Sequence, residues 1–185
     1  MMKGGEYMVL YIVIAVVVII LLWFICVSNK LRRLIVKIEE ADSGIDVALT
    51  KRYDVLTKMV DVVKGYSKHE KETLFKVIEM RKGMNISEKQ DVMKKMDDSL
   101  KQIQVLAESY PELKSSENYN TLQLSITDTE EHLQAARRMY NSNVSKLNQM
   151  VVTFPYSIVA GMKGIKEHSF FEADEEKKQD VKIDL

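Results

Sequence analysis

The sequence predicts an all-α protein: a single N-terminal transmembrane helix followed by an antiparallel bundle of three long helices, with an optional short fourth. Three observations lead to this fold class. Residues 7–27 are apolar and uncharged. From residue 31 onward, apolar residues recur mostly at three- and four-residue steps, which is the spacing of an amphipathic helix. The 185 residues contain only seven glycines and two prolines, so long helices are favoured over strands and turns.

The apolar segment 7–27, YMVLYIVIAVVVIILLWFICV, is long enough to cross a bilayer as a helix. At about 1.5 Å per residue it covers roughly 30 Å, the thickness of the hydrocarbon core. No cleavage site with small residues follows it, and bulky Phe24 and Ile25 precede the single cysteine, Cys26. We therefore expect an uncleaved anchor in contact with the lipid bilayer, preceded by a short N-terminal segment, 1–6.

The charges that flank this segment predict its orientation. Basic residues follow it directly, whereas one basic and one acidic residue precede it: Lys30, Arg32, Arg33 and Lys37 after, Lys3 and Glu6 before. Basic flanks are retained on the cytoplasmic side. The sequence thus predicts a single-pass protein of the cell membrane with its N-terminus outside and its helical domain in the cytoplasm. The 27 basic and 27 acidic residues balance, which argues against a nucleic-acid partner.

The helical domain is predicted to occupy residues 28–171. Its first helix runs from about Asn29 to Lys82, continuous with the anchor, with Gly44 and Gly65 marking a bend or a close helix contact and Gly83 following its end. An apolar stripe identifies it: Leu31, Leu34, Ile35, Ile38, Ile45, Leu49, Leu56, Met59, Val60 and Val63.

The next two helices are delimited by capping and proline signals. "SEKQ" at 87–90 fits a capping box of Ser87 and Gln90, and the "YPEL" motif ends this helix near Ser109. The third helix begins near Ser116 and ends or kinks at Pro155. It carries an apolar series at seven-residue spacing, typical of coiled-coil packing: Tyr119, Ile126, Leu133, Tyr140, Leu147 and Phe154. A short helix follows in 156–165, and the charged tail 172–185 is predicted to be disordered.

Motifs for chemistry are missing from the sequence. "HEKET" at 69–73 places Thr73 where the zinc motif H-E-x-x-H needs its second histidine, and no histidine has a carboxylate three residues before it. No G-x-S-x-G turn or glycine-rich phosphate loop occurs. We therefore predict no catalytic residue, no cofactor and no metal, and a protein that is not an enzyme.

Polar residues beside the apolar series of the third helix raise a different question. Three such residues are Arg137, Asn141 and Asn148. They are candidates for a structural polar network with polar residues of the first helix, namely Asp46, Arg52, Asp54 and Glu70. Three interpretations stay open: exposure to solvent, a network that fixes the helix register, or a ligand cleft. Burial of an unpaired charge is very costly, so the second interpretation requires close partners.

Three separated blocks of the sequence resemble the bacterial LemA family: IDVALTKRYDVLTKMVDVVKGYSKHE (45–70), YPELKSSENYNTLQ (110–123) and RRMYNSNVSKLNQMVVTFP (137–155). The resemblance implies a small bacterial membrane protein with a short N-terminus outside and an antiparallel helical domain inside. It implies no established molecular activity and no catalytic residues. Thr50 and Thr57 depart from the pattern, where a basic residue and a proline are expected.

These observations favour a membrane-anchored, non-enzymatic helical scaffold or adaptor protein of the bacterial cell envelope. It would bind protein partners, or itself, through the helical domain. The alternative is a signalling or sensor element that relays a helix displacement across the membrane, because the anchor and the first helix are predicted to be continuous.

Overall fold

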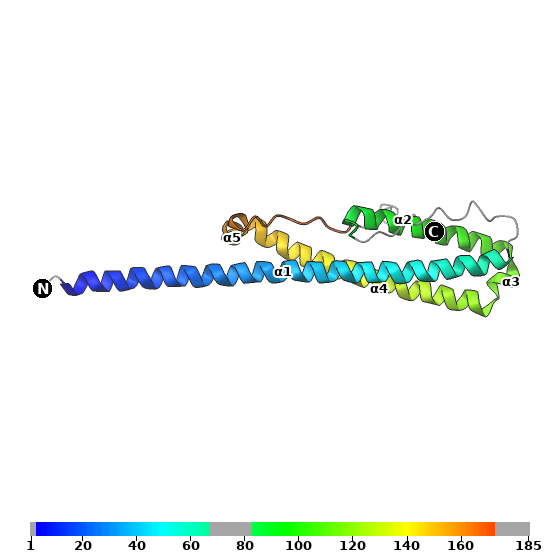
Figure 1. The fold of residues 1–185 in the computed structure, drawn as a ribbon, viewed down its shortest axis with the longest axis horizontal. Coiled ribbons are helices and arrows are strands. Elements are labelled where there is room, and N and C mark those ends of the chain that lie inside the picture. Colours follow the sequence, from blue (N-terminus) through cyan, green and yellow to red (C-terminus); the bar gives the residue numbers. More distant parts are fainter. Residues whose placement is uncertain (1–2, 67–82, 173–185) are drawn as a thin grey trace, which may run out of the picture. The chain divides into compact units, whose positions relative to one another are not determined.

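The regular structure of the protein is helical throughout the residues that the computed structural model describes, 3–66 and 83–172 (Figure 1). This confirms the all-α prediction. The five helices in these ranges are α1 (Lys3–Tyr66), α2 (Ile86–Ser109), α3 (Pro111–Lys114), α4 (Glu117–Val152) and α5 (Tyr156–Met162). A non-helical segment, 163–172, follows α5.

Helix α1 contains both the apolar segment and the first helix of the domain without interruption. Among the described residues, it is the one helix long and apolar enough to cross a membrane. Its surroundings change along its length. Residues 7–22 are all exposed, whereas Val27 is 5% exposed and Leu31 is fully buried. Beyond Val27 the predicted apolar stripe is buried, except for Ile35, which is half-buried.

The chain forms two compact units, one of residues 1–39 with 142–168 and the other of 40–141 with 169–185. In the first, buried apolar side chains come from α1, α4 and α5: Leu31, Leu34, Ile38, Val144, Leu147, Met150, Val159 and Ala160. Buried Asn143 donates a hydrogen bond to the carbonyl oxygen of Lys37 at 3.1 Å. This bond satisfies an amide that would otherwise be costly to bury.

In the second unit, α1, α2, α3 and α4 contribute the buried apolar side chains. Among them are Ile45, Leu49, Leu56, Met59, Met96, Ile103, Leu113, Tyr119, Leu133 and Tyr140. A β-carbon added to Gly44 would lie 3.9 Å from the β-carbon of Ala136, an ordinary van der Waals distance. Of the two outcomes expected for Gly44, a bend or a close helix contact, the structure has the contact.

Two predictions for the helix ends are wrong. The capping box of α2 is formed by Asn85 and Glu88, not by Ser87 and Gln90. Asn85 Oδ1 accepts from the backbone N–H of Glu88 at 3.0 Å, and Glu88 Oε2 accepts from that of Asn85 at 2.7 Å. The carboxylate is the stronger acceptor, so the helix starts earlier. Phe154 was expected in the buried series, but α4 ends at Val152 and Phe154 is 75% exposed.

Other predicted boundaries agree with the structure. Helix α2 ends at Ser109, α4 begins at Glu117 and a short helix follows Pro155. Gly83 has a φ of 77°, a left-handed conformation that glycine adopts readily, but the helix end predicted before it is not among the described residues. The predicted helix up to Lys82, together with Glu70, and the predicted disordered tail beyond Glu172 lie outside the described residues.

Candidate functional site

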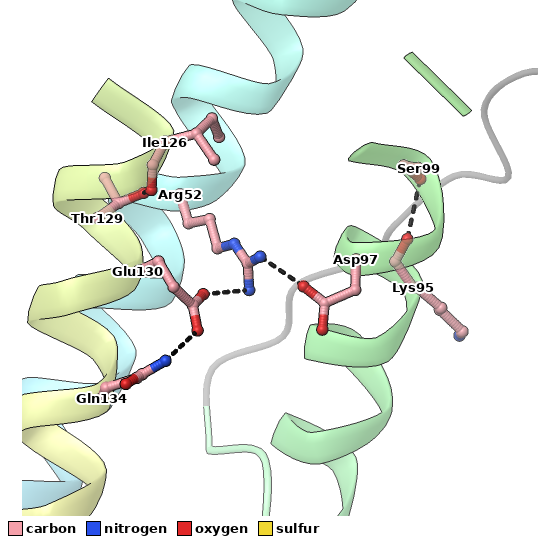
Figure 2. Close-up of polar contacts among 8 residues, drawn as sticks. All are labelled: Arg52, Lys95, Asp97, Ser99, Ile126, Thr129, Glu130 and Gln134. Atoms are coloured by element: carbon pink, nitrogen blue, oxygen red, sulfur yellow. Dashed lines mark hydrogen bonds and ion pairs between the residues drawn. The ribbon is translucent and has the colours of Figure 1, made fainter. Parts of the chain in front are cut away.

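A buried arginine joins three helices of the second unit. Arg52 of α1 is 3% exposed. Its Nη2 lies 2.5 Å from Asp97 Oδ1 of α2, and its Nη1 lies 3.1 Å from Glu130 Oε2 of α4, as Figure 2 shows. The first contact is a hydrogen bond; the second is an ion pair without hydrogen-bond geometry, between two buried atoms. Gln134 donates to the other oxygen of Glu130 at 3.1 Å (Figure 2).

A buried lysine makes a second connection between α1 and α2. Lys89 is 1% exposed, and its Nζ lies 2.6 Å from Asp42 Oδ1 and 2.7 Å from Asp46 Oδ1. The two aspartates are 36% and 48% exposed at their side chains. The Lys89 ammonium group is therefore shielded from solvent, whereas the carboxylates of Asp42 and Asp46 remain in contact with water.

These buried charges disfavour helix pairings that would separate them from their partners. Removing a charge from water costs several kcal/mol in real proteins, and only close partners offset that cost. Arg52 and Lys89 each have two carboxylates within 3.1 Å. A helix pairing that separated them from these carboxylates would leave a buried cation without a partner.

Two asparagines of α4 bind the backbone of the non-helical segment reciprocally. In the second unit, Asn141 Nδ2 donates to the carbonyl oxygen of Phe171, and Asn141 Oδ1 accepts from the N–H of Phe171, both at 2.8 Å. In the first unit, Asn148 makes the same pair of bonds with His168, both at 2.9 Å. An asparagine side chain carries an NH₂ donor next to a carbonyl acceptor, so it can bind the C=O and the N–H of one residue at the same time, as the backbone of a neighbouring strand does. We call these two contacts the asparagine clamps.

Further contacts hold the end of this segment in the second unit. Arg137 Nη2 donates to the carbonyl oxygen of Glu172 at 2.7 Å, and its guanidinium lies 4.8 Å from the ring centroid of Phe171, which is 3% exposed. The hydroxyl of Tyr140 donates to the carbonyl oxygen of Ser169 at 3.2 Å. Burial, and to a lesser degree the charge of Asp42, raises the pKa of Tyr140, so this hydroxyl keeps its proton.

The structure places the sequence-predicted residues in two separate groups. Asp46 and Arg52 contact Lys89, Asp97 and Glu130. The third-helix residues Arg137, Asn141 and Asn148 contact the segment 168–172 instead. Asp54 is exposed, with no contact to either group among the described residues, and Glu70 lies outside them.

Sequence reasoning missed Lys89, Asp97 and Glu130, although a signal for the first existed. Lys89 precedes Met96 and Ile103 at seven-residue spacing, so it occupies a position of the buried apolar series of α2. Arg52 likewise continues a heptad series on α1: Leu31, Ile38, Ile45, Arg52 and Met59. A charged residue in such a series indicates a buried ion pair.

Within the described ranges, no three histidines, cysteines, aspartates or glutamates come together in a way that could hold a metal ion. His132 lies 3.5 Å from Asp128, and both side chains are exposed. The charges connect α1 to α2 and α4, and the amides connect a peptide segment to α4.

The fold and these contacts define the class: an all-α protein in which a long apolar N-terminal helix continues into a helical bundle held by buried ion pairs. The chain belongs to the LemA family, whose model matches residues 41–185. It is also similar to Protein LemA of Metamycoplasma hominis, with 30% identity over 178 residues that cover 92% of this chain and 81% of the relative. These findings confirm the family resemblance inferred from the three sequence blocks.

Proposed function

We propose that this protein is a membrane-anchored, non-enzymatic scaffold or adaptor of the bacterial cell envelope, with one membrane-spanning segment and a cytoplasmic helical domain. The observation that carries this proposal is the change of surroundings along α1. Residues 7–22 are uncharged and exposed, whereas the residues after Val27 bury a continuous stripe. An exposed apolar surface of that length is stable only in contact with lipid or a partner.

The domain is suited to present a fixed surface. In the second unit, Gly44 of α1 lies against Ala136 of α4, and Arg52 lies against Glu130. Positions thus rise along α1 as they fall along α4, which supports an antiparallel, coiled-coil-like pairing. Arg52 connects α1 to α4 and α2, and Lys89 connects α2 to α1. Their role in the proposal is to keep one helix register in the surface that partners bind.

Anchoring and orientation are tested in one set of cells. The full chain should stay in the membrane fraction after alkaline carbonate extraction. In a Cys26→Ser background, Ser115→Cys should react with a membrane-impermeant maleimide only after lysis, whereas Lys3→Cys should react in intact cells. A chain released by carbonate contradicts anchoring, and labelling of Ser115→Cys in intact cells contradicts the orientation.

The scaffold role is tested by crosslinking in membranes. Photocrosslinkers at exposed positions of α2 and α4, such as Val105 and Leu124, should give discrete protein adducts or a dimer of the chain. The same crosslinker at Ile14, within the segment assigned to lipid, serves as the matched control. A strictly monomeric chain without protein adducts in every growth condition would refute the scaffold role.

The second candidate function is a transmembrane signalling or sensor element. It is favoured by the unbroken helix from Lys3 to Tyr66, because a rigid helix transmits rotation along its axis. One residue inserted after Asn29 rotates the following face by about 100°, whereas seven inserted residues restore it to within about 20°. If the helix relays rotation, the first insertion changes the set of crosslinked partners and the second restores it. Equal behaviour of the two variants excludes the relay.

A further inference from the structure

Four exposed apolar side chains follow each other closely along the sequence in the first unit, from the end of α4 to the end of α5. They are Val152, Phe154, Ile158 and Met162, with exposed fractions of 63%, 75%, 52% and 72%. Outside the apolar segment, the other large exposed apolar residues of the described chain, such as Leu124 and Met139, are not gathered so closely along the sequence. We call this cluster the α5 patch. Apolar patches of this kind mark contacts with proteins or membranes.

The patch lies beside the end of the segment assigned to lipid. Lys30 follows the apolar segment by three residues, about 4.5 Å of helix rise beyond Val27. Its Nζ lies 5.7 Å from the ring centroid of Tyr156, the first residue of α5. A bilayer that surrounds residues 7–27 would therefore have its polar boundary close to α5. Lys30 and the α5 patch belong to the same compact unit.

A basic groove opens next to the patch. It has a volume of about 410 Å³, and its lining contains two lysines, Lys30 and Lys146, and no carboxylate. Neither lysine has an acidic partner among the described residues. Gln149 and Thr153 add an amide and a hydroxyl that can donate hydrogen bonds. Leu34, Met150 and Tyr156 complete the lining. A lining that combines two lysines with mostly apolar surface suits a molecule that carries both a phosphate and apolar chains, because P–O⁻ oxygens accept hydrogen bonds from ammonium groups.

We propose that the α5 patch inserts into the membrane surface and that the basic groove binds the phosphate of an anionic phospholipid of the same bilayer. This inference rests on the proposed anchoring. A lipid is the occupant that fits both features, because its phosphate matches the groove and its chains match the adjoining apolar side chains. The pair of lysines without a carboxylate favours a headgroup with net negative charge, such as phosphatidylglycerol, over a zwitterionic one.

Insertion of the patch is tested with the full chain in vesicles of phosphatidylcholine and phosphatidylglycerol. Trp23 is the only tryptophan, so Trp23→Phe combined with Phe154→Trp places one fluorophore in the patch. Lipids brominated high in the acyl chain should quench most of its emission. The matched control is Leu124→Trp in the same background, a position that is similarly exposed, at 73%, but outside the patch. Its emission should stay unquenched.

The groove is tested by the lipid that copurifies with the full chain from the same vesicles, measured by mass spectrometry. The wild type should retain phosphatidylglycerol in preference to phosphatidylcholine, and Lys30→Glu/Lys146→Glu should lose this preference. Arg32→Glu/Arg33→Glu is the matched control, because both arginines are exposed on α1 and neither lines the groove. It should retain the preference. Circular dichroism checks that each variant keeps its helical content. If Lys30→Glu/Lys146→Glu fails to fold, Lys30→Gln/Lys146→Gln replaces it in the assay.

The outcomes separate this inference from the proposed function. A chain that carbonate releases from membranes refutes the anchoring. A chain that stays anchored while Phe154→Trp is unquenched, or while both charge-reversal variants lose the lipid preference equally, refutes the docking alone. Displacement of the copurifying lipid by inorganic phosphate without any headgroup preference would likewise reject the lipid as occupant.

Discussion

The ion pairs of Lys89 predict an unequal response to removal of their two sides. The cation is 1% exposed, whereas the Asp42 and Asp46 side chains are 36% and 48% exposed. Replacing both aspartates by Asn leaves a buried ammonium without a counter-charge, which costs about 3–5 kcal/mol. Replacing Lys89 by Met leaves two carboxylates that already reach water, so the loss is closer to that of individual hydrogen bonds, about 1–3 kcal/mol.

The assay is urea denaturation of the full chain in detergent micelles, followed by circular dichroism at 222 nm. The matched control is Glu39→Gln/Asp54→Asn, which makes the same change of net charge at two exposed positions and should stay within about 0.5 kcal/mol of the wild type. Adding Lys89→Met to the double aspartate variant should recover most of its lost stability, because no charge is then left buried. If Lys89→Met alone costs as much as the double aspartate replacement, the reasoning from burial is wrong.

Three further substitutions test separate parts of the packing by the same denaturation assay. Gly44→Ala should raise the free energy of unfolding by about 0.5–1 kcal/mol, because alanine favours the helix and the added β-carbon meets Ala136 at an ordinary distance of 3.9 Å; a loss of stability would show that the helices cannot accept it. Asn85→Ala should lower it by about 0.5–2 kcal/mol through loss of the cap of α2, whereas an unchanged value would deny the capping box its role. Burial raises the pKa of Tyr140 in the folded chain. The unfolded chain therefore loses this proton first, near the ordinary tyrosine pKa of about 10. The free energy of unfolding should fall as the pH rises above that value towards the folded-state pKa. Tyr140→Phe should make this alkaline loss smaller; an identical loss would contradict the assignment.

Helical periodicity predicted most of the fold because it reports directly which face of each helix is buried. Leu31, Ile45, Leu133 and Leu147 were placed in the core by spacing alone, and all four are fully buried. The error at Phe154 has the opposite origin. Its place in the heptad series presupposed that the helix continues, and α4 ends at Val152 before reaching it.

The partners of the polar residues were harder to predict, because a partner depends on which helices meet and at what register. Asn141 and Asn148 stood out in the sequence, but their contacts are backbone groups of Phe171 and His168, and a backbone group carries no signature in the sequence. The burial of Lys89 could be predicted from its position in the apolar series of α2. Its pairing with α1 was not, since many acidic residues of the chain were equally available.

Apolar residues at heptad spacing do not by themselves define the register of two packed helices. Because α1 and α4 both carry apolar residues every seven positions, sliding one helix by a heptad would preserve much of the apolar contact. A slide of α4 by seven residues brings either Gln123 or Arg137 to the place of Glu130, so Arg52 would lose that carboxylate or face another cation.

We therefore predict that the buried charges hold the helix register more than they add stability. In a Cys26→Ser background, Gly44→Cys and Ala136→Cys should form a disulfide, because the 3.9 Å between these β-carbons suits one. Gly44→Cys with Thr129→Cys, one heptad away, should not. Replacing Arg52, Asp97 and Glu130 together by Leu leaves no orphaned charge and should keep the helices stable, yet permit the shifted disulfide as well. If the triple variant still forms only the Gly44–Ala136 crosslink, apolar shape alone sets the register and the buried charges have some other role.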